Sequence, residues 1–348
     1  HTAYRRQRQM CIRDRKKILF AAVAALAITG CSQNEEIEKA AKTAEIGFNT
    51  VVKTTTRVTP LETDNFTAFH VYGYNIGETE VSNTSAFTTP LIANGSSYTR
   101  TDKNTSWAGD TYYWPASATD KLCFFAYSPE LLSPDVYAVP NNGYPTLSYA
   151  IKGVGSQEDL VIAKATNLLK EANTGGVSLV FAHALTQINF SVKLTQNFTY
   201  KITEIKIENV ANEGTLGFEN TTWTSQTGSE AYIYNVTYNS SGYNPKETSE
   251  ESSEKTVDFS TADNALMLLP QSFDDSSTAA ISVTYTVTAS NGQTTFTGTK
   301  KVALKNSTAW GEGKKIRYTL TLPTGADAIS FTPTVGGWTD DSREESAK

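Results

Sequence analysis

Apolar residues recur with a period of two along several stretches of this chain, and this pattern constrains the fold more than any other feature. In residues 178–194 the period is visible in two sets, Leu179 with Phe181 and Ile188 with Phe190. The same period recurs in residues 202–210, 281–287, 294–304 and 316–322. A period of two is typical of β-strands that bury one face, so these stretches are predicted strands.

Turn-forming residues separate the predicted strands. Asn291-Gly292 lies between two alternating stretches and is a strong signal for a tight β-hairpin. From residue 45 onward Thr, Ser, Asn, Tyr, Val and Ile dominate, and only residues 157–169 indicate a short helical or extended excursion. Because no repeated crossover helices are visible, the chain is predicted to be all-β and built from sandwiches.

A polar turn at residues 195–200 interrupts two strongly alternating stretches and is the best candidate for a domain boundary. We therefore expect an N-terminal β-sandwich over residues 45–196 and a C-terminal β-sandwich over residues 197–340. Residues 238–254 are rich in Ser, Glu and Asn and are predicted to form an exposed loop, and residues 341–348 a tail.

Residues 16–30 have the pattern of a lipoprotein signal peptide. Two lysines precede an apolar run of about half the roughly 20 residues that span a bilayer, and Thr29-Gly30 leads to Cys31. Cleavage before Cys31 and acylation of this residue are predicted, because several acyl chains, at about 0.8 kcal/mol per buried CH₂, hold a protein in a membrane leaflet. Residues 31–44 would then be a tether. Residues 1–15 precede a complete Lys-Lys start and are interpreted as non-native sequence.

Charge and cysteine content exclude several functional classes. The formal net charge is −6, and removal of the Lys-rich and Arg-rich leader makes the mature chain more acidic, so no nucleic-acid partner is expected. After Cys31, Cys123 is the only remaining thiol, so no disulfide can form within the mature chain.

No motif for catalysis, cofactor binding or metal binding is visible, and no enzyme, cofactor or metal site is predicted. His70 and His183 lie far apart in strand-like segments and are expected to be packed and hydrogen-bonded. The acidic pairs Glu158-Asp159 and Asp274-Asp275 are interpreted as solvated turn charges, because nothing in the sequence places two carboxyls across a substrate. Four tryptophans could stack on sugars, although tryptophans near Pro and Gly turns more often close a β core. They are Trp114, Trp223, Trp310 and Trp338.

Several fragments occur in the order found in one family of bacterial surface proteins. They are Tyr113-Trp114-Pro115, residues 122–129 (LCFFAYSP), Glu158-Asp159-Leu160, residues 179–185 (LVFAHAL), Leu268-Leu269-Pro270-Gln271 and residues 310–314 (WGEGK). By their order and spacing the chain resembles the Bacteroidales fimbrillin family of Mfa-like and FimA-like major fimbrial subunit lipoproteins, over about residues 46–338.

The resemblance implies two tandem transthyretin-like β-sandwiches in a lipoprotein that is anchored to outer-membrane lipid through Cys31. It also implies assembly into a pilus with other fimbrillin subunits. The acidic residues after Cys31 are similar to a surface-export signal of the same bacteria, so the expected location is the outer face of the cell outer membrane. A host or bacterial surface receptor is the further partner expected of an adhesin.

The resemblance further implies that a protease removes a first strand after an arginine, and that a strand of a neighbouring subunit fills the opened groove. The matching segment is residues 46–57. Ile46, Phe48, Thr50 and Val52 alternate like a strand that covers a core and would lie on the removed strand, and Arg57 would be the cleavage site. The alternative is that Arg57 is an ordinary exposed loop residue of an uncleaved subunit.

The implied donor strand is the C-terminal segment 329–338. Its apolar residues are Ile329, Phe331 and Val335, with Trp338 as a terminal plug. Pro333 cannot donate a ladder hydrogen bond, so the strand needs a bulge or an edge position there. The alternative is that this segment completes its own sandwich.

Three functional classes follow. The first is a non-enzymatic pilus subunit or pilus-associated adhesin, and the alternative is a surface glycan-binding lipoprotein, which would expose a coplanar aromatic platform. The third class, a secreted hydrolase, would need a cleft with converging carboxylates.

Overall fold

The computed structural model describes residues 45–52, 65–129, 136–236, 242–243, 254–259 and 264–337. Within these ranges strands β1 to β19 dominate, and the short 3₁₀ turns include η2 (Val154–Ser156) and η3 (Lys170–Asn173). The predicted all-β class is confirmed. In the same ranges no helix has the length and apolarity needed to cross a bilayer.

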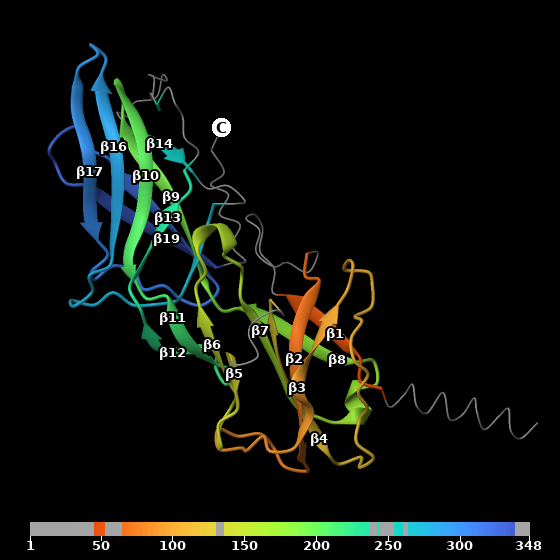
Figure 1. Cartoon of the computed structure of the whole chain (residues 1–348). Helices are drawn as coiled ribbons and strands as arrows, with labels where there is room; N and C mark the ends of the chain where they lie inside the picture. Colours follow the sequence, from red (N-terminus) through yellow and green to blue (C-terminus); the bar gives the residue numbers. More distant parts are fainter. Residues whose placement is uncertain are drawn as a thin grey trace, which may run out of the picture.

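The N-terminal half forms a six-stranded sheet with the order β1-β8-β7-β4-β2-β3. The bounds are Phe48–Val52 for β1, Ala68–Gly77 for β2, Pro90–Thr99 for β3, Lys121–Ser128 for β4, Val161–Leu168 for β7 and Val177–His183 for β8. β7 and β8 pair at two positions, through Val161 and Ile162. The β1–β8 pair can therefore turn away from the rest of the sheet and cover one face of β2, β3 and β4 (Figure 1).

The C-terminal half consists of two sheets that pack face to face. One has the order β14-β9-β18-β19, with β15 pairing to β9, and the other has the order β13-β10-β16-β17. Their bounds are Thr186–Thr195 for β9, Phe198–Val210 for β10, Glu230–Tyr234 for β13, Glu254–Asp258 for β14, Leu266–Leu268 for β15, Ala280–Ala289 for β16, Thr294–Ala303 for β17, Lys314–Thr321 for β18 and Ser330–Gly337 for β19. Rings from both sheets meet between them: Phe190 of β9 lies 4.9 Å from Tyr234 of β13, centroid to centroid.

A small sheet joins the two halves. Its order is β12-β11-β6-β5, with bounds Tyr137–Ala138 for β5, Thr146–Ala150 for β6, Glu213–Gly217 for β11 and Thr222–Thr227 for β12. β6 and β11 come from different halves and pair antiparallel, with Leu147 opposite Leu216. Both leucine side chains are fully buried. Figure 1 shows this sheet between the larger layers.

The strand pattern tests the sequence predictions in detail. The Asn291-Gly292 hairpin is confirmed, since these residues join β16 to β17 and Gly292 has a φ of +84°. Of the two alternatives for segment 157–169, helical or extended, the structure shows the extended one, because most of the segment is strand β7. β9 precedes the predicted boundary at residue 196, yet it pairs with β14 and β18, which follow that boundary.

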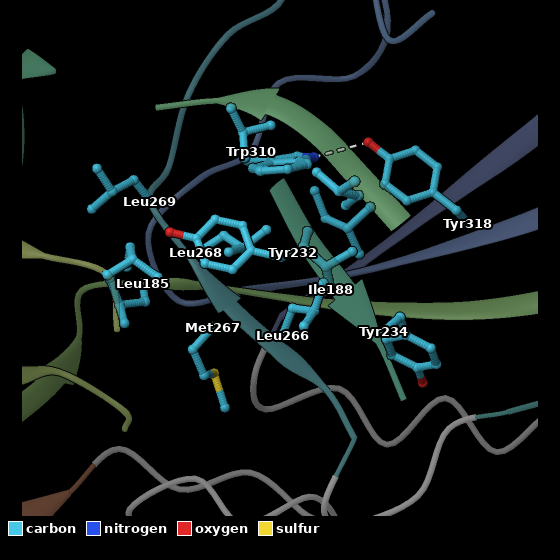
Figure 2. Packing of buried hydrophobic residues seen from close by; sticks show 14 of the residues in the cluster. Leu185, Ile188, Tyr232, Tyr234, Leu266, Met267, Leu268, Leu269, Trp310 and Tyr318 are labelled. Atoms are coloured by element: carbon cyan, nitrogen blue, oxygen red, sulfur yellow. Dashed lines mark hydrogen bonds between the residues drawn. The ribbon is translucent and has the colours of Figure 1, made fainter. Parts of the chain in front are cut away.

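Two clusters of buried apolar residues form the core. The smaller cluster lies under β1 in the N-terminal half, and the larger one extends from the outer face of β2 and β4 through the joining sheet into the C-terminal sandwich. Figure 2 shows part of the larger cluster, where Trp310 Nε1 donates a 2.8 Å hydrogen bond to the Tyr318 hydroxyl above Leu268 and Ile188.

Candidate functional site

β1 is the end strand of the six-stranded sheet and the element on which the predicted strand removal depends. It runs parallel to β8, in the register Phe48 opposite Val177 and Val52 opposite Phe181. A terminal strand held through one edge is the part of a sheet that can be exchanged without breaking any other strand pair.

The inward side chains of β1 close the smaller core cluster. Ile46, Phe48 and Val52 are 3%, 7% and 1% exposed. The Phe48 ring makes edge-on contacts with three rings, one each from β2, β3 and β4: Phe69 at 5.8 Å, Tyr98 at 4.9 Å and Phe124 at 5.3 Å between centroids. Loss of β1 would therefore open an apolar groove lined with aromatic rings.

Two hydrogen bonds fix the direction of the backbone groups along β1. Gly47 O accepts a 2.8 Å hydrogen bond from Val177 N of β8, whereas Ile46 N donates a 2.8 Å hydrogen bond to Tyr112 O on the opposite side. Because successive residues of a strand point their backbone groups to opposite edges, the N–H groups of Phe48 and Thr50 point away from β8.

Thr50 is a weak point on the inward face. It occupies the position between Phe48 and Val52 on that face, and its hydroxyl oxygen is buried without a hydrogen-bond partner. An unpaired buried hydroxyl costs about 1–3 kcal/mol. β1 is therefore held less tightly with Thr50 at this position than it would be with an apolar residue of the same size.

The predicted donor segment forms an edge strand in its own half. β19 is the end strand beside β18, and its antiparallel register runs through Pro333 without a shift. Pro333 is therefore accommodated by the edge position, and no bulge is present. Ile329 is 4% exposed, Phe331 is half-buried with its ring 5.2 Å from that of Tyr318, and Val335 is 47% exposed.

Three of the predicted site residues lie outside the described residues: Cys31, Arg57 and Trp338. Cys123 lies on β4 and is fully buried, and burial raises the pKa of its thiol to about 11. At neutral pH this thiol is therefore protonated and unreactive.

The two histidines are packed and hydrogen-bonded, as predicted. His70 Nδ1 lies 3.0 Å from Ser97 Oγ, and His183 Nδ1 lies 2.7 Å from Asp159 Oδ2. The prediction that Asp159 is a solvated turn charge is wrong, because it is 5% exposed and tied to the end of β8 through His183. Its neighbour Glu158 is exposed and pairs with Lys152.

The described ranges contain no group of three or more His, Cys, Asp or Glu side chains arranged for a metal ion. Trp114, Trp223 and Trp310 are 7%, 8% and 3% exposed, so the prediction that they close the core is confirmed. Trp223 Nε1 donates a 2.7 Å hydrogen bond to Ala184 O. These three residues do not form the exposed aromatic platform that the glycan-binding alternative requires.

The sequence placed Thr50 on the inward face of β1 but carried no sign that its hydroxyl is unpaired. That property depends on which side chains β2, β3 and β4 bring against it, and these strands lie later in the chain, outside the local pattern of β1. The His183–Asp159 pair was likewise invisible, since its members are 24 residues apart.

Comparison with known proteins gives consistent matches over most of the chain. A family model described as fimbrillin-like matches residues 56–338. Fimbrium subunit Fim1C of Phocaeicola vulgatus is 26% identical over 380 residues, which cover 94% of this chain and 97% of that protein. The crystal structure of a fimbrial protein from Bacteroides vulgatus ATCC 8482 has a TM-score of 0.66 at 23% identity and covers 85% of this chain and 100% of that one. These matches confirm the resemblance inferred from the sequence, and the structural likeness shows a shared fold.

Proposed function

The chain belongs to the fimbrillin-like family, and we propose on this basis that it is a non-enzymatic subunit of a fimbrium or an adhesin associated with one. The similarity to a fimbrium subunit over nearly the whole of both chains supports this role. We also propose that the chain forms two transthyretin-like domains. Strand β9 would belong to the C-terminal one, because it pairs with β18.

We propose that assembly proceeds by cleavage after Arg57, loss of β1 and insertion of the C-terminal segment 329–338 of a neighbouring subunit. One observation carries this proposal: β1 is an end strand whose inward side chains fill a groove between aromatic rings. Its loss would expose both the apolar groove and the hydrogen-bonding edge of β8. Such an edge binds an extended strand through its backbone, while pockets for alternate side chains select the sequence.

The test uses the chain from Ser32 to Lys348, which holds all the described residues. The protein is treated with an Arg-specific protease, its new N-terminus is sequenced, and the product is run unboiled on a denaturing gel. We expect cleavage after Arg57 and a ladder of oligomers. The matched variant Arg57→Gln should lack this cleavage and stay monomeric, and a wild-type product that is cleaved there but monomeric would contradict the proposal.

Membrane attachment is proposed through Cys31. Cells expressing the chain and fed a labelled palmitate analogue should incorporate the label into the wild-type protein and not into Cys31→Ser. Equal labelling of the two proteins would contradict this part of the proposal.

The proposed location is the outer face of the outer membrane. Protease added to intact cells should then remove the protein as completely as protease added to lysed cells. Protection in intact cells alone would place the protein behind the membrane and would contradict a fimbrial location.

A further inference from the structure

The chain contains a second arginine whose local sequence is like that of the proposed cleavage site. Arg57 and Arg100 each follow a threonine and precede a β-branched residue. Residues 101–106 are exposed and polar, and exposed loop tips of this composition are the usual targets of proteases. The local sequence therefore gives no reason for an Arg-specific protease to spare Arg100.

The side chain of Arg100 is held between backbone carbonyls and an aromatic ring. Arg100 Nε donates a 2.8 Å hydrogen bond to Phe66 O, and Nη1 donates a 3.3 Å hydrogen bond to Lys103 O. The guanidinium carbon lies 4.4 Å from the centre of the Trp107 ring, which packs edge-on against Phe66 at 5.6 Å and Phe69 at 4.7 Å between centroids. The guanidinium must leave all these partners before it can enter the arginine pocket of a protease.

The backbone on both sides of Arg100 is folded as well. Arg100 N donates a 2.9 Å hydrogen bond to Thr67 O, next to the start of β2. On the other side, Asp102 Oδ1 accepts a 2.7 Å hydrogen bond from Asn104 N, and Asp102 O accepts one of 3.1 Å from Thr105 N. These bonds bend the chain into a turn. Cleavage in such a segment requires that it first opens locally.

We propose that Trp107 and the turn at residues 101–105 protect the Arg100–Thr101 peptide bond, so that an Arg-specific protease cuts ahead of β2 and not after β3. This inference rests on the proposed cleavage after Arg57 and adds the structural reason why a second, similar arginine is spared. Trp107 acts through Arg100 and is therefore a positioning residue.

Protection of this bond preserves the groove under β1. Phe69 of β2 and Tyr98 of β3 both contact the ring of Phe48. Cuts after both Arg57 and Arg100 would leave β2 and β3 on a separate fragment, which only strand pairing with β4 would hold in the sheet. Loss of that fragment would remove two of the three rings that surround Phe48 at the moment when β1 departs.

The first experiment measures how strongly the fold protects the bond. The chain from Ser32 to Lys348 and a synthetic peptide of residues 95–106 are treated with the same Arg-specific protease, and cleavage after Arg100 is followed by mass spectrometry. The peptide has the same local sequence without the folded neighbours. We expect the folded chain to be cut after Arg100 about a hundredfold more slowly, because only its opened state is cleaved.

The second experiment tests the role of Trp107. Trp107→Ala removes the ring over the guanidinium and should speed cleavage after Arg100 about tenfold, whereas Trp107→Phe keeps a ring and should stay within about threefold of wild type. Ser106→Ala is the matched control, because Ser106 is an exposed residue of the same loop. A Trp107→Ala chain that is cut no faster than Ser106→Ala would overturn the proposal.

Arg317 distinguishes local opening from global unfolding. Arg317 Nη1 lies 3.1 Å from Asp258 Oδ2 in the C-terminal half, so cleavage after Arg317 should be equal in all variants. If Trp107→Ala speeds it, Asp102→Ala decides, since this variant removes an exposed carboxylate and its turn hydrogen bond. Faster cleavage of Asp102→Ala after Arg100 alone would support the proposal, and an unchanged rate would overturn it.

The failure of this inference differs from the failure of the proposed assembly. A wild-type chain that is cut after Arg57 and also after Arg100 at the rate of the peptide would overturn only this inference. A wild-type chain that is not cut after Arg57 would contradict the proposed assembly, and the rates after Arg100 would still decide whether that bond is protected.

Discussion

Thr50 combines a position on the inward face of β1 with a hydroxyl that has no partner. The replacement Thr50→Val keeps the shape and removes that hydroxyl, so the uncleaved subunit should gain about 1 kcal/mol in the free energy of unfolding. Urea denaturation measures this gain, and assembly after cleavage should be unaffected because β1 has left.

The matched control is Thr334→Val, which changes an exposed threonine of an edge strand and should stay within about 0.5 kcal/mol of wild type. A lower stability of Thr50→Val would mean that the Thr50 hydroxyl is hydrogen-bonded in solution. The unpaired hydroxyl would then not weaken the attachment of β1.

Glu208 should make the fold sensitive to acid. Its carboxylate is hydrogen-bonded to Lys301, Lys206 and Ser282, and the Lys301 contact is the largest cause that lowers its pKa to about 2. In the unfolded chain a glutamate titrates near about 4.3. The stability contributed by the ionised form is therefore complete above that pH and is lost as the pH falls toward 2.

The measurement is the urea midpoint of wild type and Glu208→Gln at several pH values between about 5 and 2.5. The variant should lose less stability than wild type over this window, because glutamine does not titrate. Parallel loss in the two proteins would show that the lysine contacts are broken in solution.

At the scale of elements, β19 pairs with β18 in the unassembled subunit and would lie in the groove of a neighbouring subunit after assembly. The exposure of Val335 distinguishes the two states. Val335 is 47% exposed in the unassembled subunit, and the proposed strand insertion would bury it in the groove of a neighbouring subunit. Val335→Lys should therefore change monomer stability by less than about 0.5 kcal/mol. The same change should abolish assembly, because the groove would bury an unpaired charge.

Thermal unfolding of the uncleaved monomer and the oligomer ladder after cleavage give the two readouts. Thr334→Lys is the matched control, because it adds the same charge one residue away, on the face that stays exposed in both states. Normal assembly of Val335→Lys would contradict the proposed use of this side chain.

The sequence predicted the positions of individual strands better than it predicted which strands pair with one another. The alternation in residues 281–287 and 316–322 and the Asn291-Gly292 turn gave strands and a hairpin, because both signals are local. Most of segment 157–169 is strand β7, because it pairs with β4 on one side and β8 on the other, and a single stretch of sequence does not reveal these neighbours. The edge position of β19 resolved the difficulty of Pro333 in the same way.

For the whole molecule, the joining sheet couples the two halves. Leu147 of β6 faces Leu216 of β11, and both are fully buried. Leu147→Ala and Leu216→Ala should each cost about 2–5 kcal/mol. Because the two side chains share one contact, the double variant should cost less than the sum of the single variants by about 0.5–3 kcal/mol.

The free energy of unfolding of the four proteins, measured by urea denaturation, completes this double-mutant cycle. Circular dichroism and tryptophan fluorescence should give coincident transitions, since the core is continuous across the joining sheet. Additive losses together with two separate transitions would mean that the halves unfold independently.

The sequence by itself determined the all-β class, the family resemblance and the faces of β1 and β19, because strand periodicity and side-chain order are local properties of the chain. The tertiary structure alone decided that β9 joins the C-terminal sheets, that Asp159 is buried against His183, and that Thr50 lacks a partner. Each of these depends on groups that are distant in the sequence and are brought together only when the sheets pack, so no local pattern can encode them.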